Sequence, residues 1–169
     1  MNIPDSYRKI IDPLIAHARA LLETGVELSP LAFVGNMGNK TIVPVVMDDT
    51  DDESKDFTAR GIGITAEATD ADYIFCIREA WQLAAKHADE YDKVIEKYGS
   101  IGASPYRQDV VVFTLETVHG TWIAMPPIKP KLPSKKKRTI GAVEFVFTPE
   151  IEGRFTGLLP KNKGAGSLH

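Results

Sequence analysis

Hydrophobic residues recur at three- and four-residue spacing near the start of the chain, and this period predicts an amphipathic helix. The stripe consists of Ile10, Ile11, Leu14, Ile15, Ala18, Leu21 and Leu22. Pro13 could start a second helix after Asp12, because proline suits a first helical turn and disrupts a helix interior. Gly25 is well placed to end the helix.

Two β-rich runs follow, Leu31–Val34 and Thr41–Met47, on either side of a turn rich in glycine and asparagine. This pattern predicts a β-hairpin. Pro44 has no N–H to donate to a neighbouring strand, so we expect the second run to lie at an edge of the sheet or to contain a bulge. The turn also has some residues of a phosphate-binding loop. However, Asn39 occupies the position directly before Lys40 where such a loop has glycine, and a strand follows in place of a helix, so we interpret it as a turn.

A second helix is predicted to begin at Thr50 and to run to about Thr69. Thr50 and Glu53 have the spacing of a capping box, and Phe57, Gly61, Ile64 and Ala68 would form its apolar stripe. The cluster of acidic residues around its start is explained by the favourable interaction of carboxylates with the helix dipole, without a metal ion.

The remaining pattern predicts one helix and several strands. Tyr73–Ile77 is almost wholly apolar, which is typical of a central strand, and residues 84–98 are expected to hold a short surface helix. Strands are then predicted at Val110–Val118, Thr121–Met125 and Thr139–Thr148, with a hairpin turn at His119-Gly120.

These elements favour an α+β fold with a single, mostly antiparallel sheet of about six strands, two main helices and one short helix. A chain of 169 residues fits one domain. We expect this domain to span residues 1–150 and residues 151–169 to form a flexible C-terminal tail.

The composition limits the classes of ligand, cofactor and compartment that we expect for the chain. The net charge of −3 argues against nucleic acid as the main ligand. The single cysteine, Cys76, is expected to be a buried thiol, and the sequence shows neither a signal peptide nor an apolar stretch of about 20 residues, so we expect a cytoplasmic protein that does not enter a membrane. The histidines lack metal-ligand spacing, and no metal or other cofactor is expected.

Polar residues at two predicted strand ends form the candidate ligand-binding site, which consists of Arg78, Glu79, Trp81, Ser104, Tyr106, Arg107 and Asp109. Two arginines could hold a carboxylate or phosphate through paired hydrogen bonds, and the aromatic rings could stack on a planar ligand. In the structural alternative, Glu79 pairs with Arg107 or Arg78 while Trp81 covers the core.

Residues 129–138 are rich in lysine and proline. They are expected to form a solvated loop, with contact to an acidic partner or to nucleic acid as the alternative. The loop lacks the aromatic residues that would stack on single-stranded bases.

The segment Arg78-Glu79-Ala80-Trp81 at a strand end and the segment Ser104-Pro105-Tyr106-Arg107-Gln108-Asp109 before a hairpin resemble an uncharacterised family of small bacterial proteins, some of them from mobile elements. The resemblance covers roughly residues 8–128. The family has no assigned activity, so the resemblance implies a fold and a bacterial origin but no reaction.

We therefore expect a non-catalytic interaction or regulatory domain whose ligand is a protein partner or a second copy of the chain. This expectation rests on the lack of a spaced nucleophile–base pair and on exposed edge strands. The alternative is a small-ligand-binding or hydrolytic domain with an anion site at Arg78, Glu79 and Arg107, in which a carboxylate acts as a base if burial raises its pKa.

Overall fold

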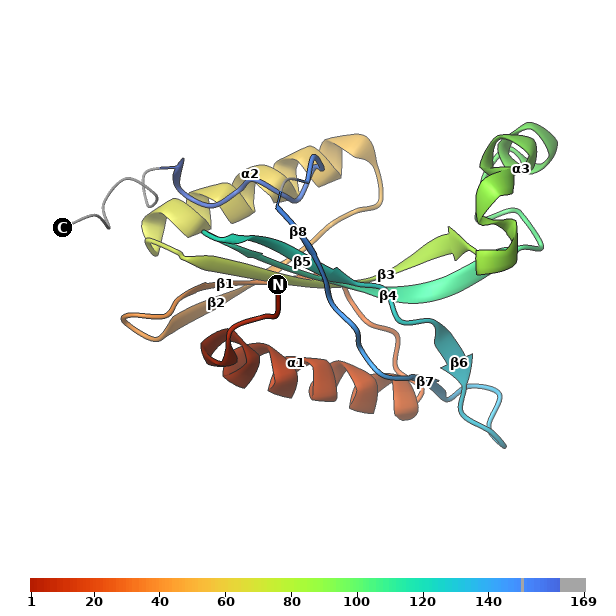
Figure 1. Cartoon of the computed structure of the whole chain (residues 1–169), viewed down its shortest axis with the longest axis horizontal. Helices are drawn as coiled ribbons and strands as arrows, with labels where there is room; N and C mark the ends of the chain where they lie inside the picture. The colour runs from red at the N-terminus through yellow and green to blue at the C-terminus, as the bar shows by residue number, and fades with distance from the viewer. Residues whose placement is uncertain (150, 162–169) are drawn as a thin grey trace.

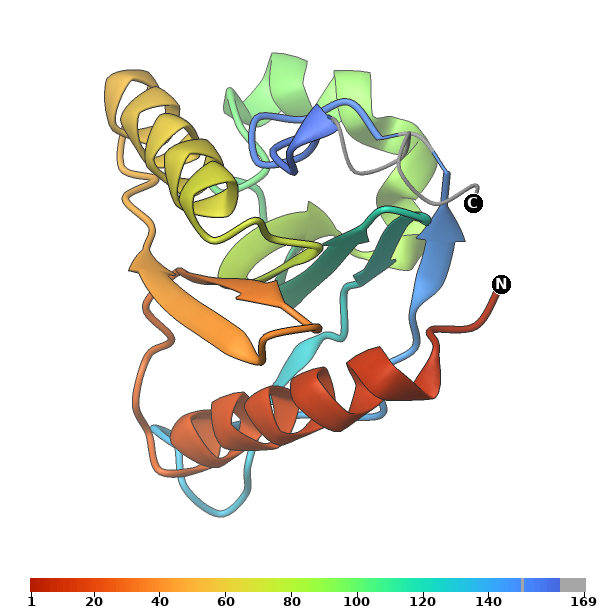
Figure 2. The same cartoon turned by 90° about the vertical axis from the view of Figure 1, so that its left-hand side faces the viewer.

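A computed structural model describes residues 1–149 and 151–161 of the chain. A six-stranded antiparallel sheet has the strand order β2-β1-β3-β4-β5-β8, and a separate two-stranded sheet pairs β6 with β7. One long helix covers each face of the large sheet (Figures 1 and 2). The predicted α+β class is confirmed.

The elements have the following bounds: α1 (Asp5–Glu23), β1 (Leu31–Asn36), β2 (Thr41–Val46), α2 (Asp52–Ala68), β3 (Tyr73–Leu83), the 3-10 helix η1 (Ala85–Glu90), α3 (Tyr91–Tyr98), β4 (Arg107–Thr117), β5 (Gly120–Ala124), β6 (Ile128–Pro130), β7 (Arg138–Ile140) and β8 (Val146–Thr148).

Helix α1 packs its predicted stripe against one face of the sheet, and Ile11 and Leu22 are completely buried there. The helix does not restart at Asp12. Pro13 lies inside it on the exposed side, where water can satisfy the carbonyl that loses its hydrogen bond. Gly25 follows the helix end with φ of +85°, as a C-terminal stop requires.

Helix α2 differs from its prediction in two respects. Its N-cap is Asp51, whose carboxylate accepts a hydrogen bond from the Ser54 N–H at 2.7 Å, in place of Thr50. The predicted apolar stripe faces solvent, since Phe57 is 78% exposed, while Ile62 and Ala66 are buried against the sheet. Helix α2 covers only part of this face of the sheet, and residues 151–161 cover a further part of it.

Those eleven residues fall in the predicted tail. Phe155, Leu158 and Leu159 pack against the core cluster beneath α2. The Arg154 guanidinium lies 3.0 Å from carboxylate oxygens of both Asp52 and Asp56. We call residues 151–161 the strap; residues 162–169 lie outside the described residues.

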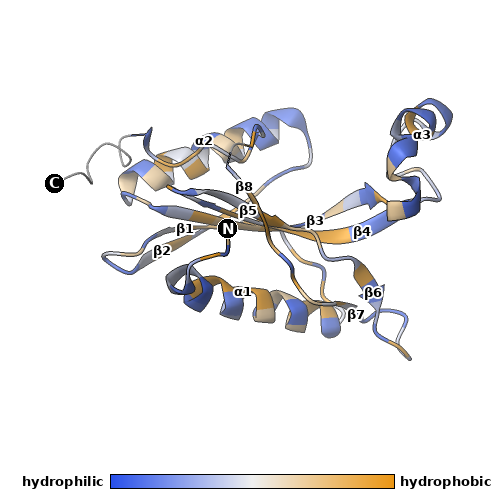
Figure 3. Ribbon diagram, in the orientation of Figure 1, coloured by the Kyte–Doolittle hydropathy of each residue, from blue (hydrophilic) through white to orange (hydrophobic). Residues whose placement is uncertain are grey.

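Strands β3 and β4 pair over eleven residues and form a ribbon that extends beyond the other strands. Tyr73–Ile77 is central, as predicted, but the strand continues through Arg78-Glu79-Ala80-Trp81, because each of these residues has a partner in β4. Helices η1 and α3 lie at the far end of the ribbon (Figure 1), and Figure 3 shows that many residues of α3 are hydrophilic.

The predicted final strand is two short strands. Residues 138–140 form β7 beside β6, and residues 146–148 form β8 beside β5. Arg19 of α1 donates hydrogen bonds to the carbonyls of Ile140 and Gly141 at 3.2 and 2.8 Å. These bonds hold the chain against α1 where it crosses from one sheet to the other. The strand containing Pro44 is β2, at the edge of the sheet, as expected.

Two glycine-to-alanine substitutions test this packing with opposite expected signs. A Cβ at Gly35 would lie 2.1 Å from the ring of buried Tyr73, whereas a Cβ at Gly61 meets no atom within 4 Å. We expect Gly35→Ala to lower the free energy of unfolding by about 1–3 kcal/mol, through overpacking. Gly61→Ala should raise it by about 1 kcal/mol, because alanine favours a helix interior. Urea unfolding of both variants measures the two changes, and equal signs would contradict the packing described.

Candidate functional site

The sheet has a step at β3. Strand β1 begins at Leu31, opposite Ile77, whereas β3 continues beside β4 as far as Leu83. Residues 78–83 therefore have a neighbouring strand on one side only. We call the open side the free β3 edge, and no strand among the described residues pairs with it.

The hydrogen bonds of the ribbon determine which backbone groups face this edge. The Ala84 N–H donates to the Tyr106 carbonyl at 2.9 Å, which makes Leu83 and Arg107 a pair without direct hydrogen bonds. Because such pairs alternate along an antiparallel ladder, Gln82 bonds to β4 and Trp81 does not. By the same alternation, Glu79, Trp81 and Leu83 direct their N–H and C=O groups toward the free β3 edge.

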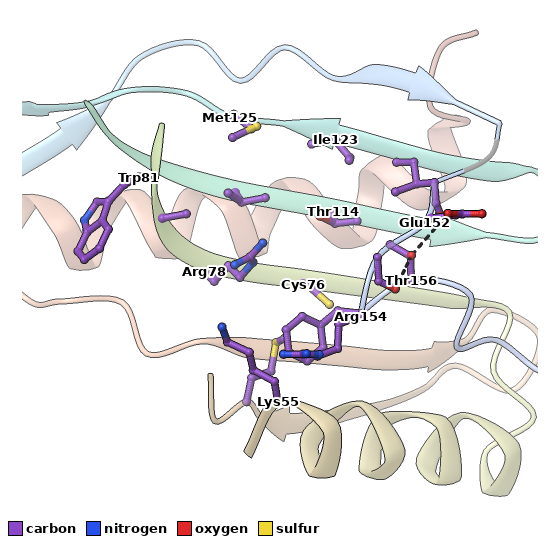
Figure 4. Close-up of a pocket in the computed structure, with 16 residues that line it drawn as sticks. Lys55, Cys76, Arg78, Trp81, Thr114, Ile123, Met125, Glu152, Arg154 and Thr156 are labelled. Carbon is purple, nitrogen blue, oxygen red and sulfur yellow. Dashed lines mark hydrogen bonds between the residues drawn. The ribbon is translucent and has the colours of Figure 1, made fainter. Parts of the chain in front are cut away.

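Two pockets lie beside this edge. The strap-side pocket has a volume of about 530 Å³ and is lined by the sheet, Lys55 and residues 151–156 (Figure 4). The hairpin-side pocket has a volume of about 550 Å³ and reaches to Ile128 and Arg138 of the β6–β7 hairpin. Both are lined by Lys55, Arg78, Ala80 and Trp81.

The strap-side pocket contains two cations that have no ion-pair partner within residues 1–149 and 151–161. Arg154 is neutralised by two carboxylates of α2. For Arg78 and Lys55, by contrast, no carboxylate of the described chain lies within 4.0 Å. Both side chains are half-buried, and Figure 4 shows them on the same side of the pocket. Among the residues that line the pocket, three cations (Lys55, Arg78 and Arg154) face one carboxylate, that of Glu152.

The other predicted charges are already paired. Glu79 pairs with Arg138 at 2.7 Å, rather than with Arg107 or Arg78, and Arg107 pairs with Asp109 at 3.1 Å. The oxygens concerned, Oε1 of Glu79 and Oδ1 of Asp109, have no well-aligned hydrogen bond, but each lies at ion-pair distance from a guanidinium. Arg78 is thus the predicted arginine that remains available to an anion.

Trp81 and Arg107 lie together, as the candidate site requires: the Arg107 guanidinium carbon is 5.0 Å from the centroid of the indole ring. Trp81 is 58% exposed, so it does not cover the core. Gly102 permits the contact with the α3–β4 loop, because a Cβ there would lie 2.3 Å from the indole ring. The ring is held in place while much of its surface remains accessible.

Ser104 and Tyr106 serve the end of the ribbon and do not line either pocket. The buried Ser104 hydroxyl accepts a hydrogen bond from the Tyr106 N–H at 3.0 Å. Tyr106 stacks on His87 with a centroid separation of 3.9 Å. Both residues therefore stabilise the end of the ribbon, where Tyr106 packs against η1.

The pockets are also lined by Lys55, Arg138 and the strap, which were not among the candidate residues predicted from the sequence. Lys55 belongs to α2, and the strap lies at the far end of the chain. Arg138 belongs to the basic segment 129–138, which the structure folds into the β6–β7 hairpin, with Lys131 bound to Glu23 at 2.9 Å. Sequence spacing contains no signal for these long-range contacts.

Cys76 lines the strap-side pocket but is 5% exposed, which confirms the predicted buried thiol. Burial raises its pKa to about 12, so the thiol is protonated near neutral pH and is a poor nucleophile. No cluster of three or more metal-ligating residues occurs within residues 1–149 and 151–161, and no described helix has the length and apolarity to cross a membrane.

Glu116 ties the strap to the sheet. Its buried carboxylate accepts a hydrogen bond from the Leu159 N–H at 3.4 Å. Burial raises the pKa of Glu116, and backbone N–H groups of residues 157–159 partly oppose that rise. The carboxylate thus provides a hydrogen-bond acceptor for backbone N–H groups of the strap, which pairs with no strand of the described chain.

Comparison of the chain with protein-family models, curated proteins and solved structures finds no match. The resemblance over residues 8–128 stays a prediction.

The raised pKa of Glu116 predicts a pH-dependent effect of Glu116→Gln. The folded protein binds the proton more tightly than the unfolded chain, so wild-type stability falls as pH rises from the ordinary glutamate value through the raised folded value. The variant lacks this loss. We expect the unfolding free energy of the variant, relative to wild type, to increase with pH across that window.

Urea unfolding at a series of pH values measures the difference. Glu152→Gln, on the exposed part of the strap, controls for the removal of one carboxylate. Parallel stability curves for wild type and Glu116→Gln would contradict the burial of this group.

Proposed function

We propose that the chain is a protein-binding domain that adds an extended segment of a partner protein to the free β3 edge. The observation that carries the proposal is the six-residue edge, Arg78–Leu83, with a pocket on either face of the strand. It fits the expected interaction domain more closely than the alternative of a hydrolytic site, because Glu79 and Asp109 are both engaged by arginines.

Strand addition explains why the pockets come as a pair. An added strand hydrogen-bonds through its backbone, and its successive side chains point to opposite faces of the sheet. One side chain would enter the strap-side pocket, and its neighbour would enter the hairpin-side pocket. Trp81, which lines both, offers a large apolar surface between them.

Backbone pairing alone would give weak binding. Each hydrogen bond contributes about 0.5–1.5 kcal/mol net, and ordering an extended segment costs free energy. The two pockets and the indole ring would therefore supply most of the selectivity, as alternate side chains do in other strand-addition complexes.

Two substitutions of Trp81 test whether the backbone edge takes part. Trp81→Val and Trp81→Pro both remove the indole, but only proline removes the N–H that faces the edge, and neither removes a hydrogen bond to β4. Random peptides displayed on phage would be selected against wild type, and their affinities measured by fluorescence polarisation. We expect binding to Trp81→Pro to be about three- to tenfold weaker than binding to Trp81→Val, because one hydrogen bond is lost.

Circular dichroism and thermal melting would establish that both variants fold. Equal affinity of the two variants, or a failure of any random peptide to bind wild type, would contradict strand addition at this edge.

A further inference from the structure

We infer that the partner segment carries an acidic side chain whose carboxylate docks against Arg78 and Lys55 in the strap-side pocket. This inference rests on the proposed strand addition and specifies the chemistry of the partner. The position follows from the ladder: a residue of the added strand placed opposite β3 shares a face with its cross-strand neighbour, and Arg78 points to the face that carries the strap.

The charges of the pocket favour an anion. Arg78 and Lys55 have no ion-pair partner among the described residues, whereas Arg154 is held by α2 at two 3.0 Å contacts. Glu152 also lines the pocket, but it is exposed and lies beyond ion-pair distance of both cations. Lys55 also interacts electrostatically with Asp51, the N-cap of its own helix, so Arg78 is the better placed of the two cations to meet an external carboxylate.

The surroundings of the cations strengthen such a contact. The remaining lining is largely apolar and includes Met47, Val112, Ile123 and Met125. A charge pair in a partly desolvated setting interacts more strongly than one in open solvent.

The hairpin-side pocket is unsuited to the same group. Arg78 and Lys55 line this pocket as well, together with Arg138, which is paired with Glu79. The four carboxylates of Glu27, Asp49, Glu79 and Asp109 nevertheless outnumber these three cations. A second acidic side chain would be repelled there. The charge difference between the pockets therefore predicts an acidic residue at one position of the segment and a neutral or basic residue next to it.

Peptide selection followed by a double-mutant cycle tests this inference. Peptides selected against wild type would be measured against wild type, Arg78→Met and Lys55→Met. Arg60→Met is the matched control, because Arg60 is an exposed cation of α2 outside both pockets. Each selected peptide would also be made with its acidic residue replaced by the corresponding amide.

We expect the selected peptides to share an acidic position and to bind Arg78→Met about tenfold more weakly than wild type. Binding of the amide peptide should be equally weak for wild type and Arg78→Met, and Arg60→Met should leave all affinities unchanged. Peptides without an acidic position that distinguish Trp81→Pro from Trp81→Val, but not Arg78→Met from wild type, would overturn the carboxylate inference and leave strand addition standing.

Titration with succinate and with inorganic phosphate separates a peptide carboxylate from a free anion. Weak binding of both, with displacement of bound peptide, supports the inference. If either anion binds tightly in an Arg78-dependent manner while no peptide binds, the pocket belongs to a small-molecule site, and both the carboxylate inference and the proposed strand addition fail.

Discussion

The antiparallel pairing of β3 with β4 over eleven residues is the interaction on which the remaining structure depends. On their other sides these strands are paired over only five residues, β3 with β1 and β4 with β5. Phe75 and Phe113 fix the inner half of the ribbon within the core. The outer half lacks a neighbouring strand on the β3 side only, since on the β4 side a bridge joins Val110 to Pro127 and the Val111 N–H donates to the Pro126 carbonyl at 3.1 Å.

The distribution of ion pairs gives this outer half its chemical character. Arg138 reaches from the β6–β7 hairpin to Glu79, and Arg107 stays with Asp109 and the face of Trp81. These contacts neutralise the acidic groups on one face of the ribbon. On the other face the strap supplies Arg154, which α2 neutralises. Within the described chain, Arg78 and Lys55 are the cations lining the strap-side pocket that form no ion pair.

The sequence predicted the elements better than their lengths and contacts. Apolar periodicity located α1 and the inner part of β3, and Pro44 correctly indicated an edge strand. The outer part of β3 was missed because Arg78, Glu79 and Gln82 break the apolar run, although a projecting ribbon tolerates polar residues on both faces. The stripe on α2 was assigned to the wrong side because Phe57 and Ile64 outweigh Thr58 and Ala66 in any hydropathy pattern. Of the candidate residues, Arg78, Glu79, Trp81 and Asp109 line one or both pockets, whereas Ser104, Tyr106 and Arg107 line neither. The contribution of Lys55 and the pairing of Glu79 with Arg138 were overlooked, since spacing does not encode distant contacts.

Pro44 has a consequence for how the molecule meets other copies of itself. By the alternation that runs across the sheet, its ring nitrogen lies on the outward side of β2. A foreign chain approaching the sheet's outer border would find a gap in the row of donors, which discourages fibre-like stacking. At the opposite border β8 is only three residues long. Growth of the large sheet from its ends is thus disfavoured, whereas the free β3 edge lies between folded segments that limit what can approach it.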